Sequence, residues 1–97
     1  MFTRIVKMEF ETHTIEEFLQ NFDKVKEHIR HFPGCTHLKL LRDKDNTDVF
    51  FTYSKWNKES DLENYRNSEL FKKVWATTKP FFRSKANAWS VDVVDEL

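Results

Sequence analysis

The first part of the chain shows two hydrophobic periods in succession. Residues 2–10 mix β-branched, aromatic and charged side chains with a period of two, which is typical of a strand. The pattern Thr14-Ile15-Glu16-Glu17 predicts a capping box at the start of a helix, and Pro33-Gly34 predicts its end. Between them, apolar residues recur at spacings of three and four, which indicates one amphipathic stripe: Ile15, Phe18, Leu19, Phe22, Val25, Ile29 and Phe32.

The rest of the chain predicts two more strands, a broken helical region and a last strand. Residues 36–42 and 49–56 have strand composition and flank a polar hairpin loop. Residues 58–82 have helical spacing, but the early apolar positions point almost opposite to the later ones at about 100° per residue. We therefore expect two helices with a break near Asn67-Ser68. Residues 86–94 predict the last strand.

The predicted order is β-α-β-β-α-β over a single domain, residues 1–97, which indicates an α+β fold of the ferredoxin-like type. Its antiparallel sheet carries the helices on one face. The strand at 49–56 is apolar on both sides, with Phe51 and Tyr53 on one and Phe50 and Trp56 on the other. Both faces of such a strand must be buried, but the helices of one chain bury only one of them. We therefore expect a homodimer, in which a second copy buries the other face.

Composition and charge narrow the classes of function. Sixteen Lys and Arg balance sixteen Asp and Glu, so the chain lacks the basic excess of a nucleic-acid-binding protein. Ten Phe, three Trp and two Tyr bury about 150–250 Å² each and can close a core in a short chain. The sequence has no signal-peptide pattern and no membrane-spanning run, and its one cysteine, Cys35, excludes an internal disulfide. We expect a cytoplasmic protein.

Tyrosine and tryptophan are the side chains most suited to a binding site. Each offers an apolar wall with one polar donor, which suits a flat organic ligand; the alternative role is simple core packing. Trp56, at the end of a strand, is expected to be a packing anchor. The other four members of this set are Tyr53, Tyr65, Trp75 and Trp89.

The four histidines provide one candidate general base and no expected metal site. His37 lies on a strand that faces either a cleft or a dimer core, so it is a candidate general base, with a hydrogen-bonded structural histidine as the alternative. His28 and His31 are three residues apart on one helix, but no third ligand accompanies them, and we expect no metal site. No His or other base lies at a spacing from Cys35 that would indicate an activated thiolate, so Cys35 is expected to be a small buried residue.

Positive charge for an anionic substrate has several candidate sources. Arg4, Lys7 and Lys79 could each offer positive charge to such a substrate, although Lys79 is more strongly expected on a solvated helix face. Arg66 belongs to a charged helical segment and is expected on a solvated helix face.

Several anchors along the chain resemble one known family. Phe32-Pro33-Gly34-Cys35, the strand that ends at Trp56, and Ser68-Glu69-Leu70-Phe71 resemble the antibiotic biosynthesis monooxygenase family. The resemblance implies a dimeric α+β barrel, in which two ferredoxin-like sheets face each other and a ligand cleft lies between helices and sheet. Members of that family include cofactor-independent monooxygenases and haem-degrading monooxygenases.

The haem-degrading branch of the family carries an Asn, a Trp and a His at its site. By the resemblance, the Asn falls on or near Val6, the Trp on Tyr65 and the His on Trp75, so all three are replaced. Trp75 cannot ligate iron, because an indole offers only an N–H donor. We therefore expect no haem degradation of that kind, and we expect Tyr65 and Trp75 to form the wall of a pocket.

Two functional classes follow. The first is a cofactor-independent monooxygenase that acts on a small aromatic or quinol-like metabolite, with His37 or Tyr53 handling the proton. The second is a non-catalytic dimeric domain that binds a small molecule or serves in stress responses. In the first class, the residues expected to hold the substrate are Val6, Tyr65, Trp75 and Trp89.

Overall fold

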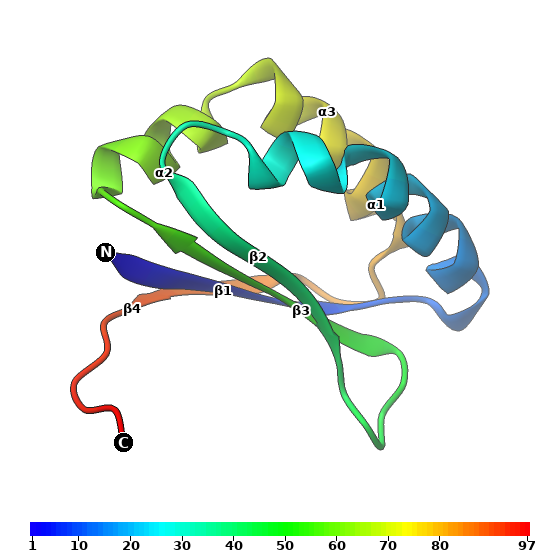
Figure 1. The fold of residues 1–97 in the computed structure, drawn as a ribbon. Helices are drawn as coiled ribbons and strands as arrows, with labels where there is room; N and C mark the ends of the chain where they lie inside the picture. The colour runs from blue at the N-terminus through cyan, green and yellow to red at the C-terminus, as the bar shows by residue number, and fades with distance from the viewer.

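The computed structural model describes residues 1–97 and has the predicted order of elements (Figure 1). The four strands form one antiparallel sheet in the order β2-β3-β1-β4, which confirms the ferredoxin-like α+β fold. Short 3₁₀ turns η1 (Thr12–Thr14) and η2 (Lys79–Phe81) join some of the elements. The strands and helices are β1 (Phe2–Glu9), α1 (Ile15–Arg30), β2 (Cys35–Arg42), β3 (Val49–Trp56), α2 (Glu59–Arg66), α3 (Glu69–Thr78) and β4 (Asn87–Val91).

The molecule has two layers. All three helices lie on one face of the sheet, and no helix or strand lies on the opposite face (Figure 1). Residues 92–97 leave β4 on the side away from the helices. No helix has the length and apolar character needed to cross a membrane.

The helices are held to the sheet by two apolar clusters. The larger packs Phe10, which follows β1, against Phe18 of α1 and Phe50 of β3, with ring centroids 4.3–5.6 Å apart. The smaller joins Trp56, which is 1 % exposed, to Cys35 and Leu62. Together these clusters fix the two ends of the space between the sheet and the helices.

The predicted break in the second helical region is confirmed at Ser68. Its Oγ accepts a hydrogen bond from the backbone N–H of Phe71 at 3.1 Å and donates to the carbonyl of Tyr65 at 2.6 Å. One hydroxyl therefore caps the start of α3 and satisfies a carbonyl at the end of α2. The two helices can then present different residues to the same sheet.

The capping box predicted at Thr14 is wrong. Thr14 already has helical backbone angles, because it is the last residue of η1, and its side chain caps no N–H group of α1. Its hydroxyl instead donates to the carbonyls of Glu11 and Phe81, at 2.7 and 3.3 Å. The end of α1 is as predicted: Gly34 follows it at φ +90°, and a Cβ at this position would overlap the side chain of Asp61.

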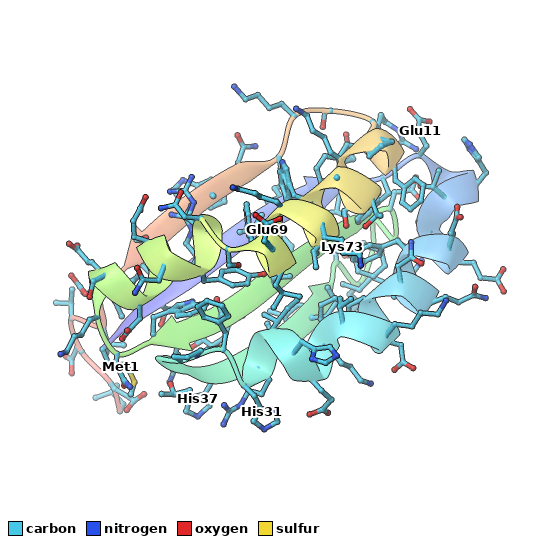
Figure 2. All side chains as sticks on the ribbon, turned by 90° about the horizontal axis from the view of Figure 1, so that it is seen from above. Met1, Glu11, His31, His37, Glu69 and Lys73 are labelled. Carbon is cyan, nitrogen blue, oxygen red and sulfur yellow. The ribbon has the colours of Figure 1, made fainter.

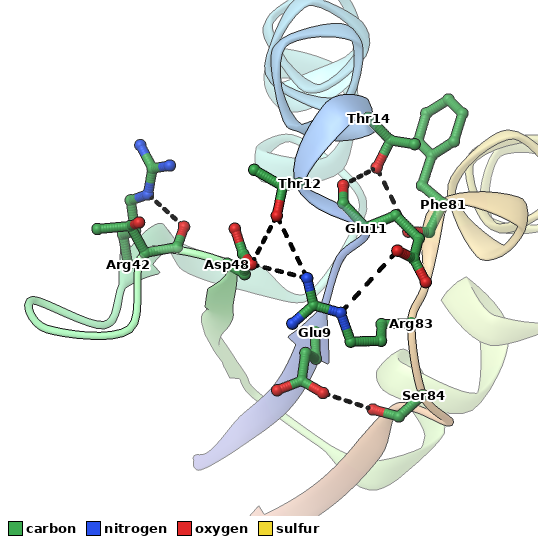
Figure 3. A network of polar contacts seen from close by, with 10 residues as sticks. Glu9, Glu11, Thr12, Thr14, Arg42, Asp48, Phe81, Arg83 and Ser84 are labelled. Atoms are coloured by element: carbon green, nitrogen blue, oxygen red, sulfur yellow. Dashed lines mark hydrogen bonds and ion pairs between the residues drawn. The ribbon is translucent and has the colours of Figure 1, made fainter.

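A network of surface hydrogen bonds and ion pairs connects the segments around Thr12, Asp48 and Arg83 (Figure 3). Asp48 Oδ2 accepts from Thr12 Oγ1 and from Arg83 Nη2, both at 2.8 Å. These hydrogen bonds keep the pKa of the Asp48 carboxyl below its ordinary value. The network joins η1, the start of β3 and the segment before β4, and it lies outside the space between the helices and the sheet.

Candidate functional site

A cavity of about 280 Å³ lies between the sheet and the helices. Its lining residues come from all four strands and all three helices, and 14 of the 19 are hydrophobic. The floor is the helix-facing side of the sheet, which includes Val6 on β1 and Ala88 on β4. The location between helices and sheet agrees with the cleft that the sequence predicts. A mostly apolar, largely pre-formed hollow with a few polar groups is typical of small-molecule sites.

One wall of the cavity is a continuous run of aromatic rings. Tyr65 stacks on Trp56 with ring centroids 5.2 Å apart, and it meets Phe71 edge to face at the same distance. Phe71 in turn stacks on Trp75 at 5.9 Å with nearly parallel planes. The break at Ser68 makes this run possible, because it lets α2 contribute Tyr65 and α3 contribute Trp75 to one surface.

Tyr65 is the titratable side chain most strongly affected by this environment. Burial raises the pKa of its phenol well above the ordinary value, and the neighbouring Cys35 adds to the shift. The hydroxyl therefore stays protonated at neutral pH. None of the chain's side-chain hydrogen bonds uses this hydroxyl, so its donor is not taken up by another side chain or by the backbone, and the residue lines the cavity.

Five polar residues complete the lining: Arg4, Thr52, Ser54, Arg66 and Thr78. Ser54 Oγ accepts from the indole Nε1 of Trp56 at 2.9 Å, and Thr78 Oγ1 donates to the carbonyl of Val74 at 2.7 Å. These two hydroxyls therefore also serve the packing of the wall. The lining contains no Asp, Glu, His, Lys or Cys, so it offers no side chain that would serve as a general base near neutral pH.

The structure separates the six predicted site residues into two groups. Val6, Tyr65 and Trp75 line the cavity. The other three lie on the opposite face of the sheet, because strand residues alternate in direction: His37, Tyr53 and Trp89.

The expectation that His37 or Tyr53 handles a substrate proton is corrected by this geometry. Tyr53 is paired with Ile5, whose neighbours Arg4 and Val6 are the β1 residues that face the cavity. His37 is exposed, and its Nδ1 lies 3.1 Å from Thr36 Oγ1. Figure 2 shows His37 at the edge of the molecule. Neither side chain reaches the cavity of its own protomer.

The open face of the sheet carries aromatic and aliphatic side chains beside the lysines Lys7, Lys39 and Lys55. Tyr53, Ile5 and Trp89 form one row across it, and Trp89 is 47 % exposed. A neighbouring row pairs Phe51 with Leu41, which is 43 % exposed. Trp89 therefore belongs to this face and not to the ring-holding wall that the sequence predicts.

The candidate cations also divide between the two faces. Arg4 lines the cavity, as expected, but Lys7 alternates onto the open face. Arg66, expected on a solvated helix face, lines the cavity as the last residue of α2. Its place immediately before the predicted break is the one signal in the sequence that would have pointed to it.

The remaining candidates are placed as expected. His28 on α1 and His31, at the C-terminal cap of that helix, are both exposed. Cys35 is buried against Trp56 and Leu62, and burial raises the pKa of its thiol, so it is not an activated thiolate.

Solved structures with the same fold are numerous. An antibiotic biosynthesis monooxygenase superposes with a TM-score of 0.91 at 19% sequence identity, covering 98% of this chain and 100% of the other. A protein from Nitrosomonas europaea that carries the same family name gives 0.89 at 16% identity, over 98% and 100%. A conserved protein from Methanosarcina mazei Go1 gives 0.87 at 16%, over 94% and 91%. At these identities the likeness establishes the fold.

The sequence itself establishes the family. No curated protein matches the chain at a significant level. The family model for antibiotic biosynthesis monooxygenase, however, matches residues 1–77, which run from β1 through most of α3 and include every cavity residue except Thr78, Ala86 and Ala88. The chain belongs to the antibiotic biosynthesis monooxygenase family.

Proposed function

We propose that the protein is a cofactor-independent monooxygenase that oxidises a small aromatic or quinol-like metabolite in the cavity between helices and sheet. The observation that carries this proposal is the aromatic wall from Trp56 through Tyr65 and Phe71 to Trp75. Flat rings pack well against such a wall, and Val6 on the floor leaves the opposite side apolar. Family membership supports the reaction class.

A quinol is a suitable substrate because it carries all the electrons that the reaction needs. One oxygen atom of O₂ enters the ring as a hydroxyl group, and the ring is oxidised to the hydroxyquinone. The second oxygen atom leaves as water, with the two hydrogens that the quinol loses. Dioxygen accepts four electrons in total, all of them from the quinol, so no further reductant takes part.

Within the cavity, the role of the protein is to bind the ring, exclude water and hold the reacting oxygen. Tyr65 is placed to donate a hydrogen bond to a substrate oxygen, because its phenol stays protonated. No lining residue takes the first proton, so the substrate enters as its anion or loses the proton to water. Trp75 and Phe71 then orient the ring from α3.

Oxygen uptake tests this proposal. The protein is offered a panel of phenols and quinols in an oxygen-electrode cell, and uptake above the rate of spontaneous oxidation is measured. We expect saturable uptake with at least one quinol, at one O₂ per hydroxyquinone formed. A panel that yields no uptake beyond the buffer blank would refute an oxygenase for this substrate class.

A second candidate function is a binding domain that retains the fold without the chemistry. The observation that favours it is the absence of a general base from the lining of the cavity. Such a domain would bind the same aromatic ligands as tightly as the enzyme does but would consume no oxygen. The oxygen measurement therefore separates the two functions directly.

We further propose that the functional unit is a homodimer in which the open face of one sheet packs against that of a second copy. Ile5, Phe51 and Tyr53 are half-buried and Trp89 is exposed on this face, although no element of the chain covers them. Exposed apolar side chains rimmed by charged ones are typical of a protein interface. Completing the burial of Ile5 or Phe51, which are already half-buried, would contribute part of the about 1.5–3 kcal/mol that full burial of such a side chain is worth.

A further inference from the structure

The cavity has two positive charges on its lining and no negative charge. Arg4 reaches it from β1, one of the two inner strands of the sheet, and Arg66 reaches it from the last residue of α2. Every other lining residue is apolar or carries a neutral polar group. No acidic residue of the lining therefore balances the two positive charges.

Arg4 has donors that the protein leaves unused. Its Nη1 donates to Ser90 Oγ at 3.1 Å, and the side chain forms no ion pair with any carboxylate of the chain. A guanidinium has five N–H donors, so most of them remain available. Burial and the charge of Arg66 both lower the pKa of Arg4, while Glu63 opposes them. A partly buried cation in this situation is stabilised by an anion.

Arg66 is only loosely held by its own helix. Its Nη1 lies 3.9 Å from Glu63 Oε2, and both side chains are about half exposed or more. An exposed pair at this distance within one helix contributes little, so Arg66 can exchange it for a better partner. Glu63 itself does not line the cavity. Two guanidinium groups thus border one apolar hollow, and the carboxylate nearest to them, that of Glu63, forms only a long, exposed ion pair with Arg66.

We propose that the cavity selects aromatic ligands that carry an anionic oxygen group, a carboxylate or a phenolate, which binds to Arg4 and Arg66 while the ring packs against Tyr65 and Trp75. This inference rests on the proposed function in using the same cavity, and it names the charge of the substrate. It also accounts for a lining without a base, because a substrate bound as its anion needs none. Hydrogen bonds from guanidinium to an anionic oxygen are short and strong.

Matched ligands that differ in charge test the proposal. Binding of 2-naphthoate and of the neutral 2-naphthamide is measured by calorimetry at low ionic strength for the full chain. We expect the naphthoate to bind about tenfold more tightly or better, because each charged hydrogen bond gained is worth that factor. In Arg4→Gln and Arg66→Gln the ratio should fall toward one. Lys73→Gln, which removes a charge from the outer surface of α3 (Figure 2), should leave it unchanged.

Three results would overturn the proposal: equal affinity of the wild type for both ligands, a preference that survives in both arginine variants, or no binding of either ligand. Oxygen uptake with quinols, measured separately, decides the proposed function. Turnover without anion preference would leave the oxygenase standing and defeat this inference. Arginine-dependent preference for naphthoate without turnover of any quinol would do the reverse.

Discussion

The indole of Trp56 and the phenol ring of Tyr65 stack with centroids 5.2 Å apart and planes inclined by 29°. Trp56 comes from the end of β3 and is buried, whereas Tyr65 comes from the end of α2 and also faces the cavity. The pair therefore joins the packed core to the wall of the site. Positions on the two sides of this junction should respond differently to substitution.

The tryptophans on the two sides provide the first prediction. Trp56→Ala should destabilise the protein by about 3–5 kcal/mol, the range for large aromatic residues in a packed core. Trp75→Ala should cost clearly less, because its ring is only half-buried and borders an open cavity. It should instead abolish binding of aromatic ligands. Urea denaturation and ligand titration measure the two effects; a Trp75→Ala protein as unstable as Trp56→Ala would place Trp75 in the core.

Alkaline pH tests the environment of Tyr65. In the unfolded chain this phenol ionises near pH 10, but in the folded protein its pKa is higher, so the folded state retains the proton longer. Stability should therefore fall as the pH rises above about 10, by up to about 1.4 kcal/mol per pH unit from this group. Tyr65→Phe should lack this part of the decline. Parallel unfolding curves for the two proteins over this range would contradict the assignment.

Acid pH tests the network around Asp48. Because hydrogen bonds from Thr12 and Arg83 lower the pKa of Asp48, its contribution to stability is present above the ordinary carboxyl range and is lost as the pH falls through the lowered pKa. Asp48→Asn should be less stable than the wild type at neutral pH and should lose less stability on acidification. Thermal unfolding between pH 2 and pH 6 measures the difference, and identical pH profiles would count against the network.

The open face of the sheet gives a prediction on assembly. Phe51→Lys places a charge in the middle of this face and should convert a dimer to a monomer. Leu19→Lys, at an exposed position of α1, serves as the control and should leave the mass unchanged. Light scattering at micromolar concentration decides the matter. A wild-type protein that is already a folded monomer would refute the dimer.

The element order could be predicted because each element has a strong local signal. The strand at 49–56 is confirmed at both ends, since it combines β-branched and aromatic residues with a polar loop before it. The break at Ser68 was also predictable, because the apolar positions on its two sides have different helical phases. The start of α1 was not, because η1 gave Thr14 a helical conformation that a capping-box pattern does not reveal.

The candidate site could be predicted only in part. Tyr65 and Trp75 were found because helical phase and the resemblance to the family point to the same positions. For His37 and Tyr53, the sequence does not reveal which face of the strands the helices cover. Two neighbouring residues of a strand point to opposite faces of the sheet. Which of the two faces the cavity depends on the face that the helices cover, and the strand sequence alone does not show this. Arg66 was missed for a similar reason, since its orientation depends on how α2 ends.

Labelled oxygen tests the central claim most directly. The protein is supplied with ¹⁸O₂ and with a quinol that gives uptake, and the product is analysed by mass spectrometry. We expect one labelled oxygen atom in each hydroxyquinone made by the wild type and by Leu19→Trp, and little product from Val6→Trp, which fills the cavity from its floor. Unlabelled product, or labelled product formed equally fast by the folded Val6→Trp protein, would contradict an oxygenase site between the helices and the sheet.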